Sequence, residues 1–295
     1  MSAARTMNQA GLPDPALWRA LADAADAETL ARFRGGGRVE NKLAREGADD
    51  GAYDPVTEAD REAERALRDV LARERPADAI LGEEHGASEG RADEAGEGRA
   101  DGASEERAAG RSPYRWVIDP IDGTRAFVAG LPVWMTLVGL EREGRAVAGL
   151  ASQPVTGERF LAPGDGTTRL LTRGGERRLH ASGTADPAVA IAMTTDPFLL
   201  DTRPGALDAI RGAVRLTRYG TDAYAFCALA AGSVDLVFEH GVQPYDVCAL
   251  IPIVEAAGGT VTDWSGGPAE AGGSILAAAS AELHAWALER LAPHA

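Results

Sequence analysis

Residues 116–127, with the sequence WVIDPIDGTRAF, constrain the fold of this chain more than any other segment. The apolar run 116–118 predicts a buried strand that ends at Asp119, because the following proline donates no N–H and keeps the preceding residue out of the helical region. Gly123 then permits a turn, after which a helix can begin. Asp119 and Asp122, beside the free N–H groups of a helix start, suit divalent cations and a phosphate together. The same dipeptides also fit an ordinary turn with two solvated carboxylates.

The composition is that of a globular protein and argues against two classes of partner. The 295 residues, 45% hydrophobic and 25% charged, suffice for two core-bearing halves or one large domain. A net charge of −15 argues against nucleic acid, whose binding depends on clustered Lys and Arg, and against an anionic membrane surface. No apolar run approaches the ~20 residues of a membrane-spanning helix, and the N-terminus lacks the pattern of a secretion signal. We therefore expect a soluble, cytoplasmic protein.

Cysteine and histidine do not form a recognisable metal or disulfide pattern. Cys227 and Cys248 lie in apolar surroundings without a CxxC spacing, which predicts two reduced core thiols. The five histidines are scattered along the chain, which argues against a zinc site.

Hydrophobic periodicity predicts an α+β part over residues 14–146 and an α/β part over residues 147–295. The predicted helices are residues 15–33, 57–75, 203–212, 222–231, 245–257 and 281–291, with a kink at Pro252. The predicted strands or hairpins are residues 79–82, 116–118, 137–140, 147–150, 153–160, 170–178, 188–193, 214–219, 234–239 and 260–262. Residues 87–111 contain no aliphatic side chain larger than alanine, so we expect a disordered acidic insert there.

Three further acidic residues are candidates that also have a structural explanation. Asp60 ends the sequence TEAD, which has the form of a capping box at a helix start. Glu83 follows the strand 79–82, where it lies either in an exposed loop or at a metal-binding edge. Asp246 comes shortly after a proline at a helix start, a position where aspartate often only caps.

Together these segments resemble the inositol monophosphatase family of metal-dependent, often lithium-sensitive phosphatases. Three motifs carry the resemblance in the family's order: GEEHG at 82–86, DPIDGT at 119–124 and YDVCALIPIVEAAGG at 245–259. It covers most of residues 15–290. The resemblance implies a layered α-β-α-β-α sandwich, a homodimer, and hydrolysis of a small phosphorylated metabolite.

The resemblance also implies roles for individual residues. Two or three Mg²⁺ ions would be bound by Glu83, Asp119, the carbonyl of Ile121, Asp122 and Asp246. The attacking water would be oriented by Glu83, Thr124 and Asp60, and the phosphate held by Asp122, Gly123 and Thr124. The substrate side would be formed by Gly220, Thr221, Asp222 and Glu239. Hard oxygen ligands suit Mg²⁺ better than imidazole or thiolate, and a two-metal site suits in-line phosphoryl transfer.

Features around these motifs look like the histidinol-phosphatase branch of the family. Inositol phosphatases typically carry Thr-Asn after the GT, and bisphosphate nucleotidases carry Lys-Glu, whereas this chain has Arg125-Ala126. The branch implies hydrolysis of L-histidinol phosphate in histidine biosynthesis, with Asp222 and Glu239 pairing with the substrate ammonium. The alternatives are an inositol-1-monophosphatase or a 3'(2'),5'-bisphosphate nucleotidase, and a catalytically inactive, metal-binding regulatory relative.

Overall fold

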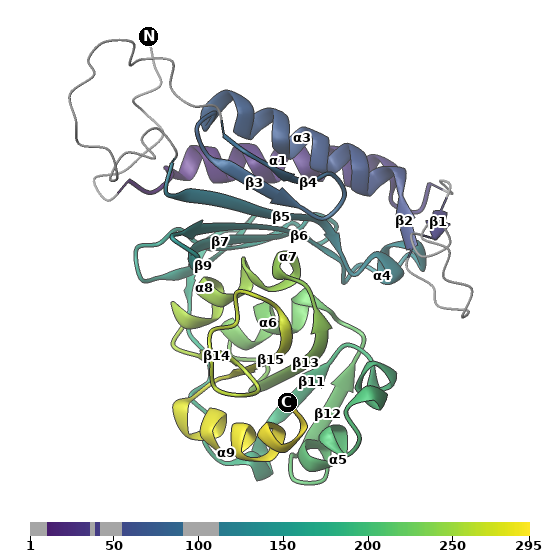
Figure 1. Cartoon of the computed structure of the whole chain (residues 1–295), viewed down its shortest axis with the longest axis vertical. Helices are drawn as coiled ribbons and strands as arrows, with labels where there is room; N and C mark the ends of the chain where they lie inside the picture. The colour runs from purple at the N-terminus through teal and green to yellow at the C-terminus, as the bar shows by residue number, and fades with distance from the viewer. Residues whose placement is uncertain (1–10, 36–38, 42–54, 91–111) are drawn as a thin grey trace, which may run out of the picture.

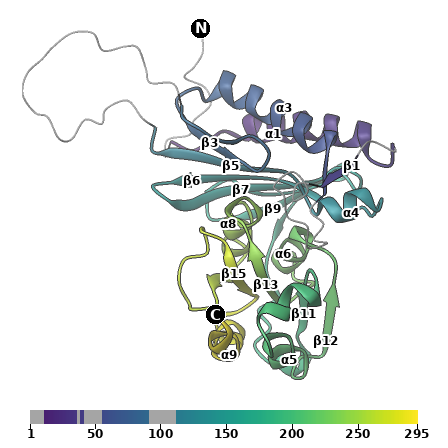
Figure 2. The same ribbon diagram turned by 45° about the vertical axis from the view of Figure 1, so that its right-hand side comes forward.

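Helices and sheets alternate in five layers in the computed structural model, which describes residues 11–35, 39–41, 55–90 and 112–295 (Figure 1). Helices α1 (Pro15–Arg32) and α3 (Glu58–Glu74) cover the outer face of the first sheet. Between the two sheets lie α6 (Ala223–Ala230), α7 (Pro244–Val247) and α8 (Leu250–Glu255). The outer face of the second sheet carries α5 (Ala206–Arg211) and α9 (Ala281–Leu291), as the turned view in Figure 2 also shows. The predicted α-β-α-β-α sandwich is confirmed.

The first sheet has eight strands in the order β10-β9-β8-β7-β6-β5-β3-β4. Their bounds are β3 (Ala79–Gly82), β4 (Gly86–Ser88), β5 (Tyr114–Asp122), β6 (Met135–Arg142), β7 (Arg145–Gln153), β8 (Glu158–Ala162), β9 (Thr168–Thr172) and β10 (Gly175–Leu179). Neighbouring strands are antiparallel except β3 and β5, which are parallel and pair Gly82 with Ile118. Glu83, which follows β3, therefore begins beside Asp119, which follows Ile118 within β5.

The second sheet has five strands in the order β12-β11-β13-β15-β14. Their bounds are β11 (Ile191–Thr194), β12 (Leu216–Tyr219), β13 (Leu236–Val242), β14 (Thr260–Asp263) and β15 (Gly273–Ala278). Strand β11 is parallel to both neighbours, and β15 is antiparallel to both of its own. The remaining elements are a small pair, β1 (Val39–Asn41) with β2 (Pro55–Thr57), the short helix α4 (Thr124–Val128), and three 3₁₀ turns at Pro187–Val189, Pro197–Thr202 and Ala292–His294.

Separate apolar clusters hold the layers together. Trp18, Leu67 and Trp116 lie between the outer helices and the first sheet, each at most 1% exposed. Phe226 and Ile251 belong to the cluster between the sheets, and a third cluster lies under α5 and α9. Full burial of such a side chain contributes about 1.5–3 kcal/mol, so these clusters supply the main stabilisation of the sandwich.

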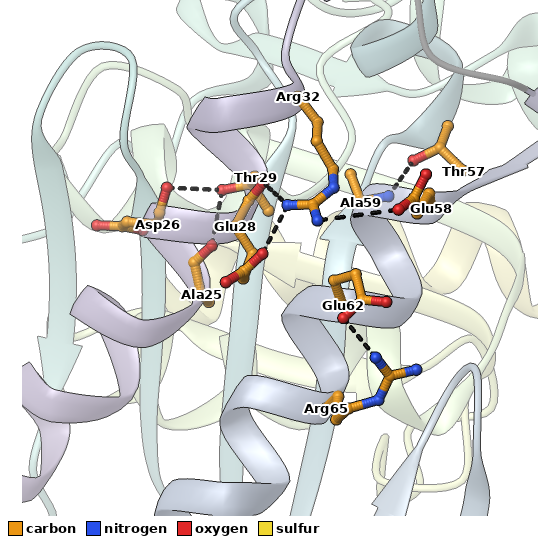
Figure 3. A network of polar contacts seen from close by, with 10 residues as sticks. All are labelled: Ala25, Asp26, Glu28, Thr29, Arg32, Thr57, Glu58, Ala59, Glu62 and Arg65. Atoms are coloured by element: carbon orange, nitrogen blue, oxygen red, sulfur yellow. Dashed lines mark hydrogen bonds and ion pairs between the residues drawn. The ribbon is translucent and has the colours of Figure 1, made fainter.

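Polar contacts join the end of α1 to the start of α3 (Figure 3). The Arg32 guanidinium lies 2.6 Å from the Glu28 carboxylate and 4.0 Å from that of Glu58. Thr57 caps α3 by accepting a hydrogen bond from the Ala59 N–H at 3.1 Å. These contacts hold the first turn of α3, which carries Asp60.

The prediction that the central strand ends at Asp119 is wrong. Strand β5 continues to Asp122 with a register shift, since Asp119 pairs with Leu137 but Asp122 pairs with Met135. Pro120 therefore falls in an irregularity of the ladder, where its missing N–H costs no regular bond. Its carbonyl accepts a hydrogen bond from Thr136 Oγ1 at 2.7 Å.

Other boundaries also differ from prediction. The helix predicted over 245–257 is divided into α7 and α8 at residues 248–249, because Pro252 cannot bond to the carbonyl four residues earlier and its ring crowds that group. The strand predicted from residue 188 begins at Ile191, after a 3₁₀ turn, and β15 was not predicted. Residues 86–88 form β4, so the predicted disordered insert begins too early, and residues 91–111 lie outside the described residues.

The division at residues 146/147 stays a proposal. Strands β7 to β10 lie in the first sheet, which therefore extends beyond that boundary to Leu179. Cys227 and Cys248 are both free and buried, as predicted.

Candidate active site

The parallel pairing of β3 and β5 brings Glu83 and Asp119 together. Glu83 donates its backbone N–H to the carbonyl of Ile118 at 3.2 Å, which fixes the start of the Glu83 loop beside β5. The Glu83 carboxyl group is near enough to hydrogen-bond with Asp119 and to raise its pKa. Two residues that are 36 positions apart in the sequence therefore share one site.

The loop at 119–124 is held by its own polar groups. Asp119 Oδ1 accepts the Ile121 N–H at 3.0 Å, and Thr124 Oγ1 donates to the Ile121 carbonyl at 3.0 Å. Gly123 adopts a left-handed conformation with φ of 80°, which a side chain would strain, and α4 begins directly after it. The carbonyl of Ile121 keeps a second lone pair, so its bond to Thr124 leaves it able to bind a cation.

Asp119, Asp122 and Asp246 form a cluster whose carboxylate oxygens lie within 4.8 Å of one another. Asp122 is oriented by the Ala223 N–H at the start of α6, at 2.7 Å. Asp246 accepts the Gln243 N–H at 2.7 Å and so completes a capping box at the start of α7. Asp246 therefore both caps α7 and belongs to the cluster, although the sequence presents these two roles as alternatives.

Burial and mutual repulsion perturb these carboxyl groups. Burial is the main cause that raises the pKa of Asp119 well above its ordinary value, followed by the charges of Glu83, Asp122 and Asp246. Burial also raises the pKa of Asp122 most, followed by the charges of Asp222 and Asp246. A divalent cation would offset this repulsion, and an all-oxygen donor set fits Mg²⁺ rather than zinc or copper.

Asp60 connects α3 to the same loop. Its Oδ2 accepts hydrogen bonds from the Thr57 N–H at 2.8 Å and the Thr57 hydroxyl at 2.5 Å, which confirms the predicted capping box. Its other oxygen lies 3.4 Å from Thr124 Oγ1. Burial raises the pKa of Asp60 to about 7, against the hydrogen bonds from Thr57 that lower it.

A pocket of about 190 Å³ adjoins the cluster, and Asp122, Asp222, Glu239 and Asp246 all contribute to its wall. The structure does not bring Gly220 and Thr221 to this wall: the Gly220 N–H bonds to the Thr195 carbonyl at 2.8 Å, and Thr221 Oγ1 lies 3.9 Å from the sulfur of Met193. These two residues instead form the turn that leads to Asp222.

The two acids predicted for the substrate side are held differently. Glu239 is 3% exposed and accepts hydrogen bonds from Thr194 Oγ1 (3.2 Å), the Thr195 N–H (2.7 Å) and Thr195 Oγ1 (3.0 Å). Burial raises its pKa to about 8. Burial raises the pKa of Asp222 to about 6, while the charge of Arg125 lowers it.

Sequence reasoning missed several residues of this region. Thr195 and His240 line the pocket, and His240 Nδ1 lies 2.8 Å from Ser274 Oγ. Glu64, which is completely buried, binds the loop after Glu83. In the sequence, His240 could have been found only through its position next to Glu239. Glu64 could have been found only through its position four residues after Asp60.

The sequence matches the model of the inositol monophosphatase family over residues 19–294, so the chain belongs to that family. The family is metal-dependent, usually with Mg²⁺, and acts as phosphatase on small phosphorylated substrates.

Three similar proteins differ in the activity after which they are named. A histidinol-phosphatase of Streptomyces coelicolor is 37% identical over 284 residues, which cover 92% of this chain and 94% of the relative. A chloroplast bifunctional phosphatase of Arabidopsis thaliana is 37% identical, covering 81% of this chain and 66% of that protein. The solved structure of an inositol monophosphatase from Zymomonas mobilis has a TM-score of 0.73 and 35% identity, with 94% and 96% of the two chains covered.

Within the described residues, no helix is both long and apolar enough to cross a membrane.

Proposed function

We propose that this phosphatase is a Mg²⁺-dependent histidinol-phosphatase, which hydrolyses L-histidinol phosphate to L-histidinol and phosphate. The observation that carries the proposal is the convergence of Asp119, Asp122 and Asp246 beside a pocket whose wall also includes Asp222 and Glu239. The intact set of acidic side chains argues against a catalytically inactive regulatory relative. A homodimer is also proposed, on the resemblance to the family alone, and the expected cytoplasmic location stays a proposal.

Glu83, Asp119, the carbonyl of Ile121, Asp122 and Asp246 would hold the cations. Bound Mg²⁺ would supply positive charge to the phosphate oxygens and lower the pKa of water at the site. This assignment rests on the all-oxygen donor set and on the burial and mutual repulsion that raise the pKa values of Asp119 and Asp122.

Thr124, Asp60 and Glu83 would orient the attacking water. The Thr124 hydroxyl donates its hydrogen to the Ile121 carbonyl, so its lone pairs remain available to accept a hydrogen bond from water. Asp60 Oδ1, at 3.4 Å from this hydroxyl, can hold a proton in the same relay, because its pKa of about 7 lies near neutral pH. The backbone of Gly123 and Thr124, together with Asp122, would hold the phosphate.

Histidinol phosphate carries an ammonium and an imidazole behind its phosphate, whereas inositol phosphate offers only hydroxyl groups. Asp222 and Glu239 contribute acidic groups to the pocket wall, which suits the ammonium. Each charge-assisted hydrogen bond contributes roughly 1.5–3 kcal/mol, or about ten- to a hundredfold in binding. The relative from Streptomyces coelicolor, which is a histidinol-phosphatase, supports this substrate.

One observation favours an inositol phosphate as the second candidate. Glu239 already accepts hydrogen bonds from Thr194 and Thr195, so it is less available to an ammonium than Asp222. The similar protein from Zymomonas mobilis, an inositol monophosphatase, covers nearly the whole chain.

The test measures kcat/KM for L-histidinol phosphate, inositol 1-phosphate and a nucleoside 3',5'-bisphosphate. Histidinol phosphate should be the best substrate, and Asp222→Asn should reduce its kcat/KM roughly ten- to a hundredfold, with a smaller effect from Glu239→Gln. Both variants should affect inositol phosphate less. Asp208→Asn, which removes a carboxylate with 71% side-chain exposure that pairs with Arg211, is the control. A preference for inositol phosphate, or an equal loss of kcat/KM on all three substrates, would reject the histidinol-phosphate assignment. The conclusion that the protein is a phosphatase would remain.

A further inference from the structure

The carboxylate of Glu64 lies under the loop that carries Glu83. Glu64 is on α3, one turn after Asp60, and is fully buried. Its Oε2 accepts the Glu84 N–H at 2.6 Å, and its Oε1 accepts the His85 N–H at 3.1 Å. The two backbone amides that follow Glu83 are thus both bound by one side chain of a helix.

Arg68 extends this contact along the loop. Its Nε lies 2.8 Å from Glu64 Oε1, and its other nitrogens donate to the Gly86 carbonyl and, at 2.9 Å, to Ser88 Oγ. The pair therefore binds the chain from residue 84 to residue 88. Since Glu64 is buried and ionic, it needs these donors to offset its desolvation.

Gly82 allows the approach. A Cβ atom at this position would lie 2.1 Å from Glu64 Oε1 and 2.8 Å from Arg68 Nη2, so any side chain would displace the pair. The conformation of the segment GEEHG is accordingly fitted around the Glu64 carboxylate.

We infer that Glu64 and Arg68 are positioning residues for Glu83, an inference that rests on the proposed function. They hold the loop so that the Glu83 carboxyl group faces Asp119, and they attach it to the helix that carries Asp60. Asp60 and Glu83, which approach the site from separate segments, are thereby placed by one rigid element.

The alternative is that the buried pair serves only stability. The two roles differ in what a substitution changes: a stabilising pair affects unfolding, whereas a positioning pair affects metal affinity and turnover in the folded enzyme. Because Glu83 would act on the cation and the attacking water, its displacement should reduce kcat much more than it raises KM.

The experiment compares Glu64→Gln with a matched change on the same helix. Glutamine keeps the volume of Glu64 but can oppose only one of the loop amides with an oxygen, because its amide nitrogen is a donor. The control is Glu62→Gln, since Glu62 pairs with Arg65 at 2.5 Å on α3 (Figure 3) and takes no part in the hydrogen bonds that Glu64 and Arg68 make to the loop. Mg²⁺ affinity is measured by titration calorimetry on metal-free protein, and kcat and KM on whichever phosphomonoester the wild type hydrolyses best.

Glu64→Gln should weaken Mg²⁺ binding and lower kcat, each roughly ten- to a hundredfold, with KM within about twofold of wild type. Arg68→Lys should change both in the same direction but less, and Glu62→Gln should leave both unchanged. If Glu64→Gln fails to fold, Arg68→Lys decides by the same measurements.

Wild-type Mg²⁺ affinity and kcat in a folded Glu64→Gln protein with a lowered Tm would show a purely stabilising pair and overturn the inference. A wild type that binds Mg²⁺ but hydrolyses no phosphomonoester rejects the proposed function, while the Mg²⁺ affinities still decide the positioning role. A wild type that binds no Mg²⁺ overturns both.

Discussion

Replacing Asp119 with asparagine removes one negative charge from the buried cluster and should stabilise the protein without metal. Asp119 is 2% exposed, and its Oδ1 accepts the Ile121 N–H at 3.0 Å, a bond that an asparagine oxygen can also accept. The substitution therefore changes the charge while preserving the local geometry. The remaining effect is that no charge has to be buried at this position and that the repulsion by neighbouring carboxylates is removed. These are the two causes that raise the pKa of Asp119.

The distances set the size of the effect. The oxygens of Asp119, Asp122 and Asp246 lie within 4.8 Å of one another, and two full charges at that separation repel by roughly 3 kcal/mol at an effective dielectric constant near 20. Partial protonation reduces this repulsion, so the metal-free variant should gain about 1–2 kcal/mol, or roughly 2–8 °C in Tm. The wild type should instead gain about 2.7 kcal/mol when Mg²⁺ is present at a hundred times its Kd.

The assay is scanning calorimetry at pH 7.5 in a chelator and in MgCl₂, together with phosphate release. Asp119→Asn should have the higher Tm in the chelator, a much smaller increase in Tm with MgCl₂, and almost no turnover. Asp208→Asn, whose side chain is 71% exposed, should behave as wild type in all three. The reasoning fails if Asp119→Asn is less stable than wild type in the chelator, if it keeps the full Mg²⁺ response, or if either protein turns over fully in chelator.

Two further predictions concern pH and Thr124. Burial raises the pKa to about 7 for Asp60, about 6 for Asp222 and about 8 for Glu239, so their stabilising contribution is complete below the ordinary values near 4 and is lost as pH rises through 6–8. The Tm of metal-free protein should therefore fall between pH 6 and 8, and fall less in Glu239→Gln; a Tm that stays level contradicts this. Thr124→Val removes the hydroxyl that bonds the Ile121 carbonyl and should lower kcat about a hundredfold, whereas Thr124→Ser should restore most activity. Equal activity of the valine and serine variants would show that the hydroxyl does not take part.

Several local features were predictable because neighbouring residues determine them. The capping box at Thr57 and Asp60 depends on groups three residues apart, and α9 was predicted with the bounds that it has. The predicted strands 137–140 and 147–150 are joined by a short turn at Glu143 and Gly144, both of which have positive φ. In each case the determining contacts lie within a few positions, where side-chain type and backbone preference are sufficient.

The predicted end of β5 was wrong because the rule that proline ends a strand takes no account of pairing with the neighbouring strand. Proline should end a strand, but the ladder with β6 accommodates Pro120 by a register shift, and the strand continues to Asp122. Strand pairing over many residues is stronger than the local preference of one proline.

The sequence by itself determined which acidic residues were candidates, through motifs shared with the inositol monophosphatase family. Only the tertiary structure decided what each of them contacts. Glu83 meets Asp119 because β3 pairs in parallel with β5, and Asp246 joins them because α7 packs against β5. Likewise, the bonds between Glu64 and the Glu83 loop depend on how α3 packs over the sheet. Strand register and helix packing are set by the burial of whole apolar faces. The spacing of the acidic residues along the chain therefore does not predict these contacts.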